Sequence, residues 1–405
     1  MDKCILIISG GIEAAEAARR AKEMGLFVVV SDRDPRAPGF AFADSCILAD
    51  VYGPEETVQA AERFNRKVRR IDGVICVAAD ALVTAAHVAE RLGLPGIGLQ
   101  SARLACDKMA MKQRFAAAGV PVPWFREVAT AQELQRVVIE RGADLVIKPV
   151  DSRGSRGVQR LGKVSDLAAA FVFARRHSPS ERVMVEQYLS GPQLSTESLI
   201  CEGQVFTPGL SDRNYEYLDR FAPFFIENGG DLPSHLPADQ QAKVKDVVRR
   251  AAAALGIRNG TVKGDIVVHD GEPHVIELAA RLSGGFFCTR EIPLNTGVDF
   301  VGCALRLALG ETITAEDAEP KHLVPVVQRY AFPPPGRIVA IEGAEEARTI
   351  AGVEDVVITA RTGDIIPAAG DKRPSAAMVL ARGDSRAQAL KAANDALACL
   401  RIRTT

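Results

Sequence analysis

Short apolar runs alternate with alanine-rich stretches along the first hundred residues. Runs rich in β-branched residues, such as "CILIIS", "LFVVVSD" and "GVICVAA", predict buried strands. The stretches between and after them predict helices over residues 13–24, 54–65 and 81–92. Strands and helices that alternate in this way are typical of a parallel sheet with helical crossovers. We therefore expect an N-terminal parallel α/β domain over residues 1–100.

The pattern changes beyond this domain. A helix predicted over residues 108–118 ends at Gly119, and the extended connector "GVPVPWFREV" marks a boundary. Further helices are predicted over residues 131–141, 165–174, 238–255 and 385–400. Strands are predicted at "LVIKP", "VMVEQYL" and "STESLICEGQVFTPGLS", and a hairpin at "GTVKGDIVVHDGEPHVIELAARL" has Asp270 and Gly271 at its tip. A last strand-rich segment starts at "YAFPPPGRI".

Composition narrows the class of protein. A chain of 405 residues predicts about three domains, and its 50 basic and 51 acidic residues are scattered without a polybasic run. We therefore expect no nucleic-acid or membrane partner. Eight distant cysteines without a C-x-x-C pair are expected to be reduced and mostly buried. The chain begins with a strand and has no apolar run of membrane-spanning length, so a cytoplasmic location is expected.

The first strand leads into the turn "SGGIEAAEA", which invites comparison with a dinucleotide-binding fingerprint. Gly10 and Gly11 are present, but Ala14 or Ala15 stands where the spacing requires the third glycine. Asp32, after the second strand, is the residue that would hold a ribose. We interpret the stretch as a plain strand-to-helix turn. A nicotinamide-dependent oxidoreductase is the alternative reading.

A lysine lies inside an apolar strand in "LVIKPVDSRGSRGV". Burying an ammonium group without a partner is costly, so Lys148 is expected to meet an anion. The loop 151–157 that follows can supply backbone and side-chain donors to that anion, which suits a polyphosphate. The residues concerned are Ser152, Gly154, Ser155, Arg156 and Gly157. The alternative is a mobile surface loop with Lys148 reaching solvent.

Two carboxylates occupy the arms of the predicted hairpin. Pairing around its tip can place Asp265 and Glu277 on one face, close enough to share a divalent ion bound to phosphates. Magnesium fits oxygen ligands of this kind. Arg281 follows within reach of the same site. The alternative is a pair of solvated strand acids.

These two constellations, in this order, resemble the ATP-grasp superfamily. The segments that carry the resemblance are "ACDKMAMKQRFAAAGVPVPWF", "LVIKPVDSRGSRGV", "VEQYLSGPQLSTES" and "GDIVVHDGEPHVIELAARLSGG". The resemblance implies a two-subdomain ATP-grasp domain over residues 101–320, with a lid subdomain at about 121–190. It also implies a small strand-rich α+β C-terminal module over residues 321–405. In this superfamily ATP and magnesium turn a carboxylate into an acyl phosphate, which an amine then attacks.

Site residues follow from the resemblance position by position. Lys108 and Lys148 would contact phosphates, and the loop 151–157 would close over them. Catalysis would rest on Lys148 and on Arg281, which would steady the acyl phosphate. The adenine edge would be held by Glu186 and by the backbone of Gln187 and Leu189. Magnesium would be bound by Asp265 and Glu277. Two positions depart from the family pattern: Gln193 replaces a ribose-binding glutamate, and Ala279 replaces an asparagine that commonly helps bind metal.

The sequence is most similar to the amino-acid ligase branch of the superfamily. There the segment "SDRNYEYLDRFAPFFIENGGDLPS" would fold over the acceptor pocket, with Arg213 and Glu227 pairing with a substrate carboxylate and amine. The alternative for each is a surface ion pair. The stretch from "YAFPPPGRI" through "GDIIPAAGD" resembles the C-terminal module of the biotin-carboxylase and purine-ligase branches and would buttress the site. A homodimer through the first or last domain is compatible with this likeness.

The sequence thus predicts an ATP-dependent ligase acting on a small carboxylate and an amine. The alternative within the same fold is a catalytically impaired ATP-binding protein with a regulatory or scaffold role, which Gln193 and Ala279 favour. The identities of the acid and the amine, and the number of magnesium ions, stay open.

Overall fold

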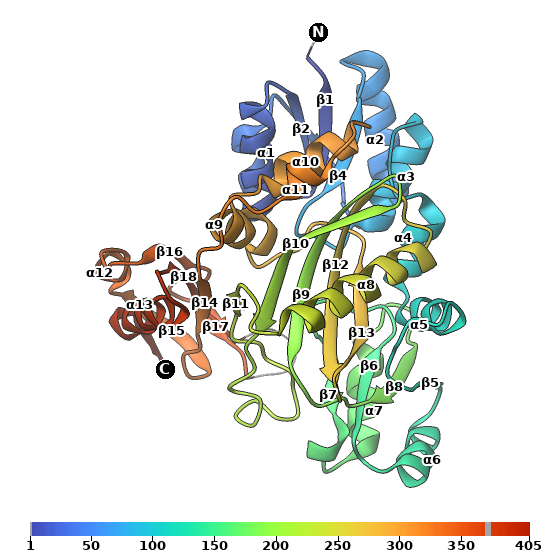
Figure 1. Ribbon diagram of the computed structural model, residues 1–405, viewed down its shortest axis with the longest axis vertical. Helices are drawn as coiled ribbons and strands as arrows, with labels where there is room; N and C mark the ends of the chain where they lie inside the picture. Colours follow the sequence, from blue (N-terminus) through green and yellow to red (C-terminus); the bar gives the residue numbers. More distant parts are fainter. Residues whose placement is uncertain (1, 369–373) are drawn as a thin grey trace.

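A computed structural model of the protein describes residues 2–368 and 374–405. Figure 1 shows the N-terminal domain at one end of the long axis and the lid subdomain at the other. The large central sheet lies between them, and the C-terminal module lies beside it. The stretch "GDIIPAAGD" runs beyond the described residues from position 369 onward.

The N-terminal domain contains a parallel sheet, as the alternating pattern predicts. Its strand order is β3 (Ser45–Leu48), β2 (Phe27–Asp32), β1 (Cys4–Ile8) and β4 (Gly73–Cys76). Helices α1 (Ile12–Glu23), α2 (Pro54–Lys67) and α3 (Leu82–Leu92) connect and cover it. Alternate residues of β1 enter two different cores, so both faces of the sheet are buried.

The glycine turn after β1 is a structural turn. The Gly10 amide donates to the Asp32 carboxylate at 2.7 Å, and the Asp34 amide donates to the same side chain at 2.9 Å. A Cβ atom at Gly10 would lie 2.7 Å from the Cβ of Ala37. Close packing therefore accounts for the glycine, and backbone amides occupy the carboxylate that the oxidoreductase alternative needs for a ribose.

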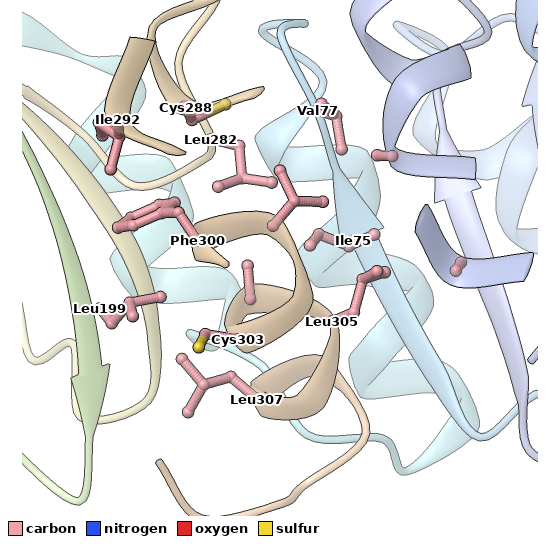
Figure 2. Packing of buried hydrophobic residues seen from close by; sticks show 14 of the residues in the cluster. Ile75, Val77, Leu199, Leu282, Cys288, Ile292, Phe300, Cys303, Leu305 and Leu307 are labelled. Carbon is pink, nitrogen blue, oxygen red and sulfur yellow. The ribbon is translucent and has the colours of Figure 1, made fainter. Parts of the chain in front are cut away.

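A buried helix joins the N-terminal sheet to the central sheet. Helix α10 (Phe300–Ala308) lies in a core that contains Ile75 of β4 on one side and Leu199 of the central sheet on the other. Figure 2 shows Phe300, Leu305 and Leu307 of this helix between the two sheets. The N-terminal domain and the central sheet thus share one hydrophobic core.

The central sheet is antiparallel and, in the described chain, has eight strands. Their order is β13 (Glu272–Ala279), β12 (Gly260–His269), β9 (Gln193–Cys201), β10 (Gln204–Arg213), β11 (Gly230–Leu232), β14 (Val326–Ala331), β18 (Ala377–Arg382) and β16 (Val353–Ile358). Helix α8 (Ala238–Ala254) covers one face with an apolar side. The β12–β13 turn has Asp270 and Gly271 at positive φ, which confirms the predicted hairpin tip.

The lid subdomain has its own small sheet and core. The antiparallel order is β5 (Phe125–Val128), β8 (Val183–Gln187), β6 (Leu145–Pro149) and β7 (Gln159–Arg160). Helices α6 (Ala131–Arg141) and α7 (Leu167–Arg176) pack on it through residues such as Leu134 and Phe171. Helix α7 starts later than the predicted range because Asp166 caps it, accepting a hydrogen bond from the Ala169 amide.

The C-terminal module is continuous with the central sheet. Strands β14, β18 and β16 extend that sheet through β11. The expected domain boundary at residue 320 therefore divides strands that belong to one hydrogen-bonded sheet. The rest of the module comprises β15 (Gly336–Glu342), β17 (Ile365–Ile366), β19 (Arg401–Thr404), α12 (Ala344–Arg348) and α13 (Arg386–Cys399).

Shorter helices complete the connections: α4 (Leu99–Cys106), α5 (Lys108–Ala117), α9 (Ile292–Thr296) and α11 (Ala315–Ala318). In the parts of the chain that the structure describes, no helix has the length and apolar character needed to cross a membrane. All eight cysteines are free, and Cys46 is the exposed member of the set.

Candidate active site

Two adjoining cavities lie where the lid, the hairpin and the N-terminal domain meet. The larger, of about 780 Å³, is lined by residues of all three, and the smaller, of about 130 Å³, lies between the lid sheet and the hairpin. Nearly all the residues singled out from the sequence line one or both: Lys108, Lys148, Ser152, Gly154, Ser155, Glu186, Gln187, Leu189, Gln193, Arg213, Glu227, Asp265, Glu277 and Arg281. The fold thus gathers positions that are up to 173 residues apart, from Lys108 to Arg281.

The buried lysine of the lid sheet has a partner inside the protein. Lys148 forms an ion pair with Glu186, which also pairs with Lys112 of α5 at 2.8 Å. Glu186 and Lys148 lie diagonally on adjacent strands, because Val146 is opposite Glu186 and Lys148 is opposite Met184. Lys148 therefore meets an anion, as expected, and the protein itself supplies one in the Glu186 carboxylate. We call Lys112, Lys148 and Glu186 the buried triad.

The buried triad carries more positive than negative charge. Burial alone would raise the pKa of the Glu186 carboxyl, but the charges of Lys112 and Lys148 outweigh burial and lower that pKa. Burial lowers the pKa of Lys112, and the charge of Glu186 opposes this shift. One carboxylate facing two ammonium groups leaves a positive charge that an incoming anion would neutralise. Lys112, which the sequence reasoning missed, lies one helical turn after Lys108.

The two hairpin carboxylates are direct cross-strand partners. Asp265 of β12 is opposite Glu277 of β13, next to a bulge, as the hairpin register predicts. Arg213 donates to Asp265 at 2.6 Å, and Lys263 also pairs with it. Burial would raise the pKa of Asp265, but Arg213 and Lys263 lower it to about 2. Lys108 lies 3.3 Å from Glu277, so basic side chains neutralise both carboxylates.

Two carboxylates facing one cavity fit magnesium in character and number. This ion commonly takes one or two protein carboxylates and completes its shell with phosphate oxygens and water. In the described residues no group of three or more histidine, cysteine, aspartate or glutamate side chains could hold a metal. Ala279 lines the larger cavity and offers no side-chain oxygen. The donor set therefore fits a metal that arrives with phosphates.

Arg281 is held by the N-terminal domain. Its guanidinium donates to Asp80 at 2.9 and 2.7 Å, across 201 residues of sequence, and to the Leu282 carbonyl at 3.0 Å. Burial would lower the pKa of Arg281, and Asp80 more than offsets it. Asp80 follows the strand "GVICVAA" at the carboxyl end of β4, a position where ligand-facing residues gather in parallel sheets. The sequence reasoning missed Asp80, although its position directly after a predicted parallel strand could have identified it.

Arg213 and Glu227 pair with each other in the wall of the larger cavity. Their side chains are 13% and 19% exposed, and the Arg213 guanidinium donates to Glu227 at 2.5 Å. The alternative of surface ion pairs is therefore wrong about their location. The segment that carries Glu227 also places Phe224, Phe225 and Ile226 on the cavity wall.

A further buried carboxylate, Glu197, lies behind the site. It accepts a hydrogen bond from the Ser283 amide at 3.0 Å, and burial raises its pKa to about 7. On the same sheet it is opposite Lys263, the residue that pairs with Asp265. Glu197 was not anticipated, since it lies within an apolar-looking strand.

The loop 151–157 is anchored at its start and open at its tip. Asp151 accepts hydrogen bonds from the Ser178 hydroxyl at 2.5 Å and the Ser180 amide at 3.0 Å. The Lys108 ammonium donates to the Ser152 carbonyl at 2.8 Å, and the Arg153 guanidinium lies 4.1 Å from the Tyr52 ring centre. The loop therefore touches both the helix of Lys108 and the N-terminal domain.

Gly157 plays a different structural part from the one expected. Its φ is +78°, and a Cβ atom there would lie 2.6 Å from Pro149 Cγ. The backbone conformation and the packing against Pro149 therefore both require glycine at this position. In the smaller cavity the Gln187 amide donates to the Trp124 carbonyl at 2.8 Å, so this amide is already used within the lid.

Comparison with known proteins agrees with this architecture. Family models match in chain order: an ATP-grasp N-terminal domain at residues 17–96, an ATP-grasp domain at 105–285 and an L-amino acid ligase C-terminal domain 2 at 329–405. An uncharacterized protein of Sinorhizobium fredii is 29% identical over 399 residues, covering 96% of this chain and 80% of the relative.

Two ligases extend the comparison. The D-alanine–D-alanine ligase of Ralstonia nicotianae is 30% identical over 232 residues, covering 54% of this chain and 68% of that protein. The crystal structure of an L-amino acid ligase from Bacillus licheniformis superposes with a TM-score of 0.84 at 22% identity, covering 100% of this chain and 99% of that one. The chain therefore belongs to the carboxylate–amine ligase branch of the ATP-grasp superfamily.

Proposed function

We propose that this protein uses ATP to activate a small-molecule carboxylate as an acyl phosphate and joins it to an amine, releasing ADP. One observation carries the proposal: two kinds of charged group meet at adjoining cavities. Lys148 and Glu186 of the buried triad, which has an excess of positive charge, line the smaller cavity, and the Asp265–Glu277 pair lines both. The first suits an anionic polyphosphate, and the second suits the metal that accompanies it. The adjoining space is large enough for a second small molecule.

In this proposal Lys108, Lys148 and the donors of the loop 151–157 hold the phosphates. Glu186 pairs with two lysines and also lines the smaller cavity, so it can position their ammonium groups and still accept a hydrogen bond from the adenine edge. The Gln187 carbonyl and the Leu189 backbone complete the proposed adenine site, with the apolar Val146 and Ile266 in the same cavity wall. Gln193 lines the same cavity and can hydrogen-bond a ribose hydroxyl.

Asp265 and Glu277 are the proposed magnesium ligands. When bound, magnesium would neutralise phosphate charge and fix the orientation of the γ-phosphate. Arg213 and Lys263 pair with Asp265, and Lys108 pairs with Glu277, so basic side chains position both carboxylates.

Arg281 is the group proposed to stabilise the transferring phosphoryl group. A carboxylate oxygen of the substrate attacks the γ-phosphorus, the bond to the β-phosphate oxygen breaks, and ADP leaves. The amine then attacks the acyl carbon, and phosphate leaves. Asp80 keeps the guanidinium in place during both steps through its two hydrogen bonds.

The test is ADP release from ATP and magnesium over a panel of carboxylic acids and amines, with mass analysis of products. A C–N-linked product formed with one equivalent of ADP supports the proposal. An enzyme that binds a non-hydrolysable ATP analogue but releases no ADP with any acid would contradict it, and would favour the catalytically impaired alternative.

Glu277→Gln provides the matched variant for the same assay. We expect turnover to fall about 100-fold while affinity for the ATP analogue changes little, because the lost charge is proposed to bind the metal and makes no contact with the adenine. Near-normal ADP release by this variant would show that the hairpin is not the metal site. Exposed Glu345→Gln, on the C-terminal module, is the control.

A further inference from the structure

One acidic side chain in the wall of the larger cavity stands apart from the others. Glu291 ends the π-helical turn Phe287–Glu291, and only 3% of the residue is exposed. Every other acidic residue lining this cavity has a donor: Asp80, Asp151, Glu227, Asp265 and Glu277. Among the residues that the structure describes, no hydrogen bond or ion pair reaches the Glu291 carboxylate.

The surroundings of Glu291 add negative charge. Burial raises its pKa well above the ordinary range, and Glu227, Glu13 and Asp231 raise it further. Arg329 opposes this effect, but its guanidinium already donates to Asp231 at 2.6 Å. Arg213 is likewise shared between Glu227 and Asp265. The protein itself thus leaves this buried carboxylate without a cation of its own.

A buried, unpaired carboxylate is costly to keep in a folded protein. The cost falls when a ligand brings hydrogen-bond donors and positive charge to it. Glu291 gains its negative charge most readily when a cation reaches it, and the nearby Glu227 and Asp231 disfavour an anionic ligand, so the complementary ligand group is an ammonium. The cavity that Glu291 lines also holds Arg281 and Glu277, where the proposed chemistry takes place.

We propose that Glu291 binds the ammonium group of the amino acid whose carboxylate this enzyme activates. The inference rests on the proposed function and adds the residue that selects an amino acid over a plain carboxylic acid. Held by a carboxylate, this amine stays protonated and does not act as a nucleophile. It therefore does not compete with the second substrate for the acyl phosphate.

The experiment compares amino acids with their des-amino analogues, such as alanine with propionate, in the ADP-release assay. We expect the wild-type enzyme to accept an amino acid and to use its des-amino analogue at least tenfold less efficiently. In Glu291→Gln we expect KM for the amino acid to rise about tenfold or more, with a smaller change in kcat. Affinity for a non-hydrolysable ATP analogue should stay unchanged, and Glu345→Gln should behave as wild type.

The outcomes separate the two proposals. Absence of ADP release with every acid defeats the proposed function. Turnover in which propionate serves as well as alanine, or a folded Glu291→Gln enzyme with unchanged KM for the amino acid, overturns the role of Glu291 and leaves the ligase activity standing. If Glu291→Gln does not fold, the wild-type comparison of each amino acid with its des-amino analogue decides the question.

Discussion

The carboxylate of Glu186 is shared by two ammonium groups, and this arrangement explains how Lys148 can be buried inside the lid sheet. Lys112 is fully buried and Lys148 is 5% exposed, so both ammonium groups have lost most of their water. Glu186 offsets part of that loss and leaves one charge uncompensated. Removing a lysine and removing the glutamate should therefore affect different properties of the protein.

We expect Lys148→Ala to weaken binding of ATP about tenfold or more while leaving the fold intact, because Glu186 keeps Lys112 as a balanced partner. Glu186→Gln should instead lower the free energy of unfolding by about 3–5 kcal/mol, since two buried ammonium groups would lose their counter-ion. Isothermal titration with an ATP analogue and chemical denaturation measure the two quantities. Unchanged ATP affinity in folded Lys148→Ala would mean that this lysine serves structure alone.

The buried Glu197 should make stability depend on pH. Burial raises its pKa from the ordinary 4.5 to about 7, so the folded state holds a proton that the unfolded chain has released. Stability contributed by this group is therefore greatest below about pH 4.5 and falls as pH rises to about 7. Glu197→Gln should reduce the slope of unfolding free energy against pH in this window.

Glu13 keeps part of that slope in the variant, because burial raises its pKa to about 7 as well. Denaturation of wild type, Glu197→Gln and the exposed control Glu345→Gln at several pH values measures the effect. Identical slopes in all three proteins would contradict it.

Individual site residues were predictable where local sequence fixes their geometry. The "HDGEP" turn sets the register that puts Asp265 opposite Glu277. The partners of Lys148 and Arg281 were not predictable, because they come from 38 and 201 residues away. An ion pair between residues so far apart in the sequence depends on tertiary packing, which the local pattern of apolar and polar residues does not reveal.

The loop 151–157 joins the lid to two other parts of the protein through few contacts. Without nucleotide, we expect trypsin to cut after Arg153 or Arg156, because glycines flank them and the loop tip is exposed. A non-hydrolysable ATP analogue with magnesium should slow this cleavage, since the loop donors gain partners only from phosphate. Tyr52→Ala should speed cleavage in the free protein by removing the ring beside Arg153.

Equal cleavage rates with and without the analogue, under conditions where calorimetry shows binding, would rule this loop out as the phosphate lid. The cleavage rate at exposed basic residues of the C-terminal module provides the internal control.

Regular strands and amphipathic helices were predictable from the sequence, and helix α10 shows where such prediction ends. Its sequence "FVGCALRLA" is apolar on nearly every side, and seven of its nine residues are buried. A helix that is surrounded by protein is buried on most sides, so its position between two sheets cannot be read from its own pattern of apolar residues. The eight-stranded sheet was equally hidden, because β11 and β14 pair across almost a hundred residues.

The shared core predicts that the N-terminal domain and the central sheet unfold together. Leu305 of α10 is fully buried between them, so Leu305→Ala should lower the free energy of unfolding by about 2–5 kcal/mol. Denaturation followed by circular dichroism should show one transition moved to lower denaturant. Ile139→Ala on the lid surface, where the side chain is exposed, is the matched control and should change little.

The same helix restricts how this protein can be recombined with its relatives. Transferring residues 1–100 alone to another ATP-grasp chain would replace one wall of a core whose other walls come mainly from residues 282–318 and from strands of the central sheet. A functional chimera would need both segments from one parent, although they lie far apart in the gene. Crossover points placed at the domain boundaries of the sequence would therefore disrupt this enzyme. Exchange of the lid, which has a separate core, would leave the shared core intact.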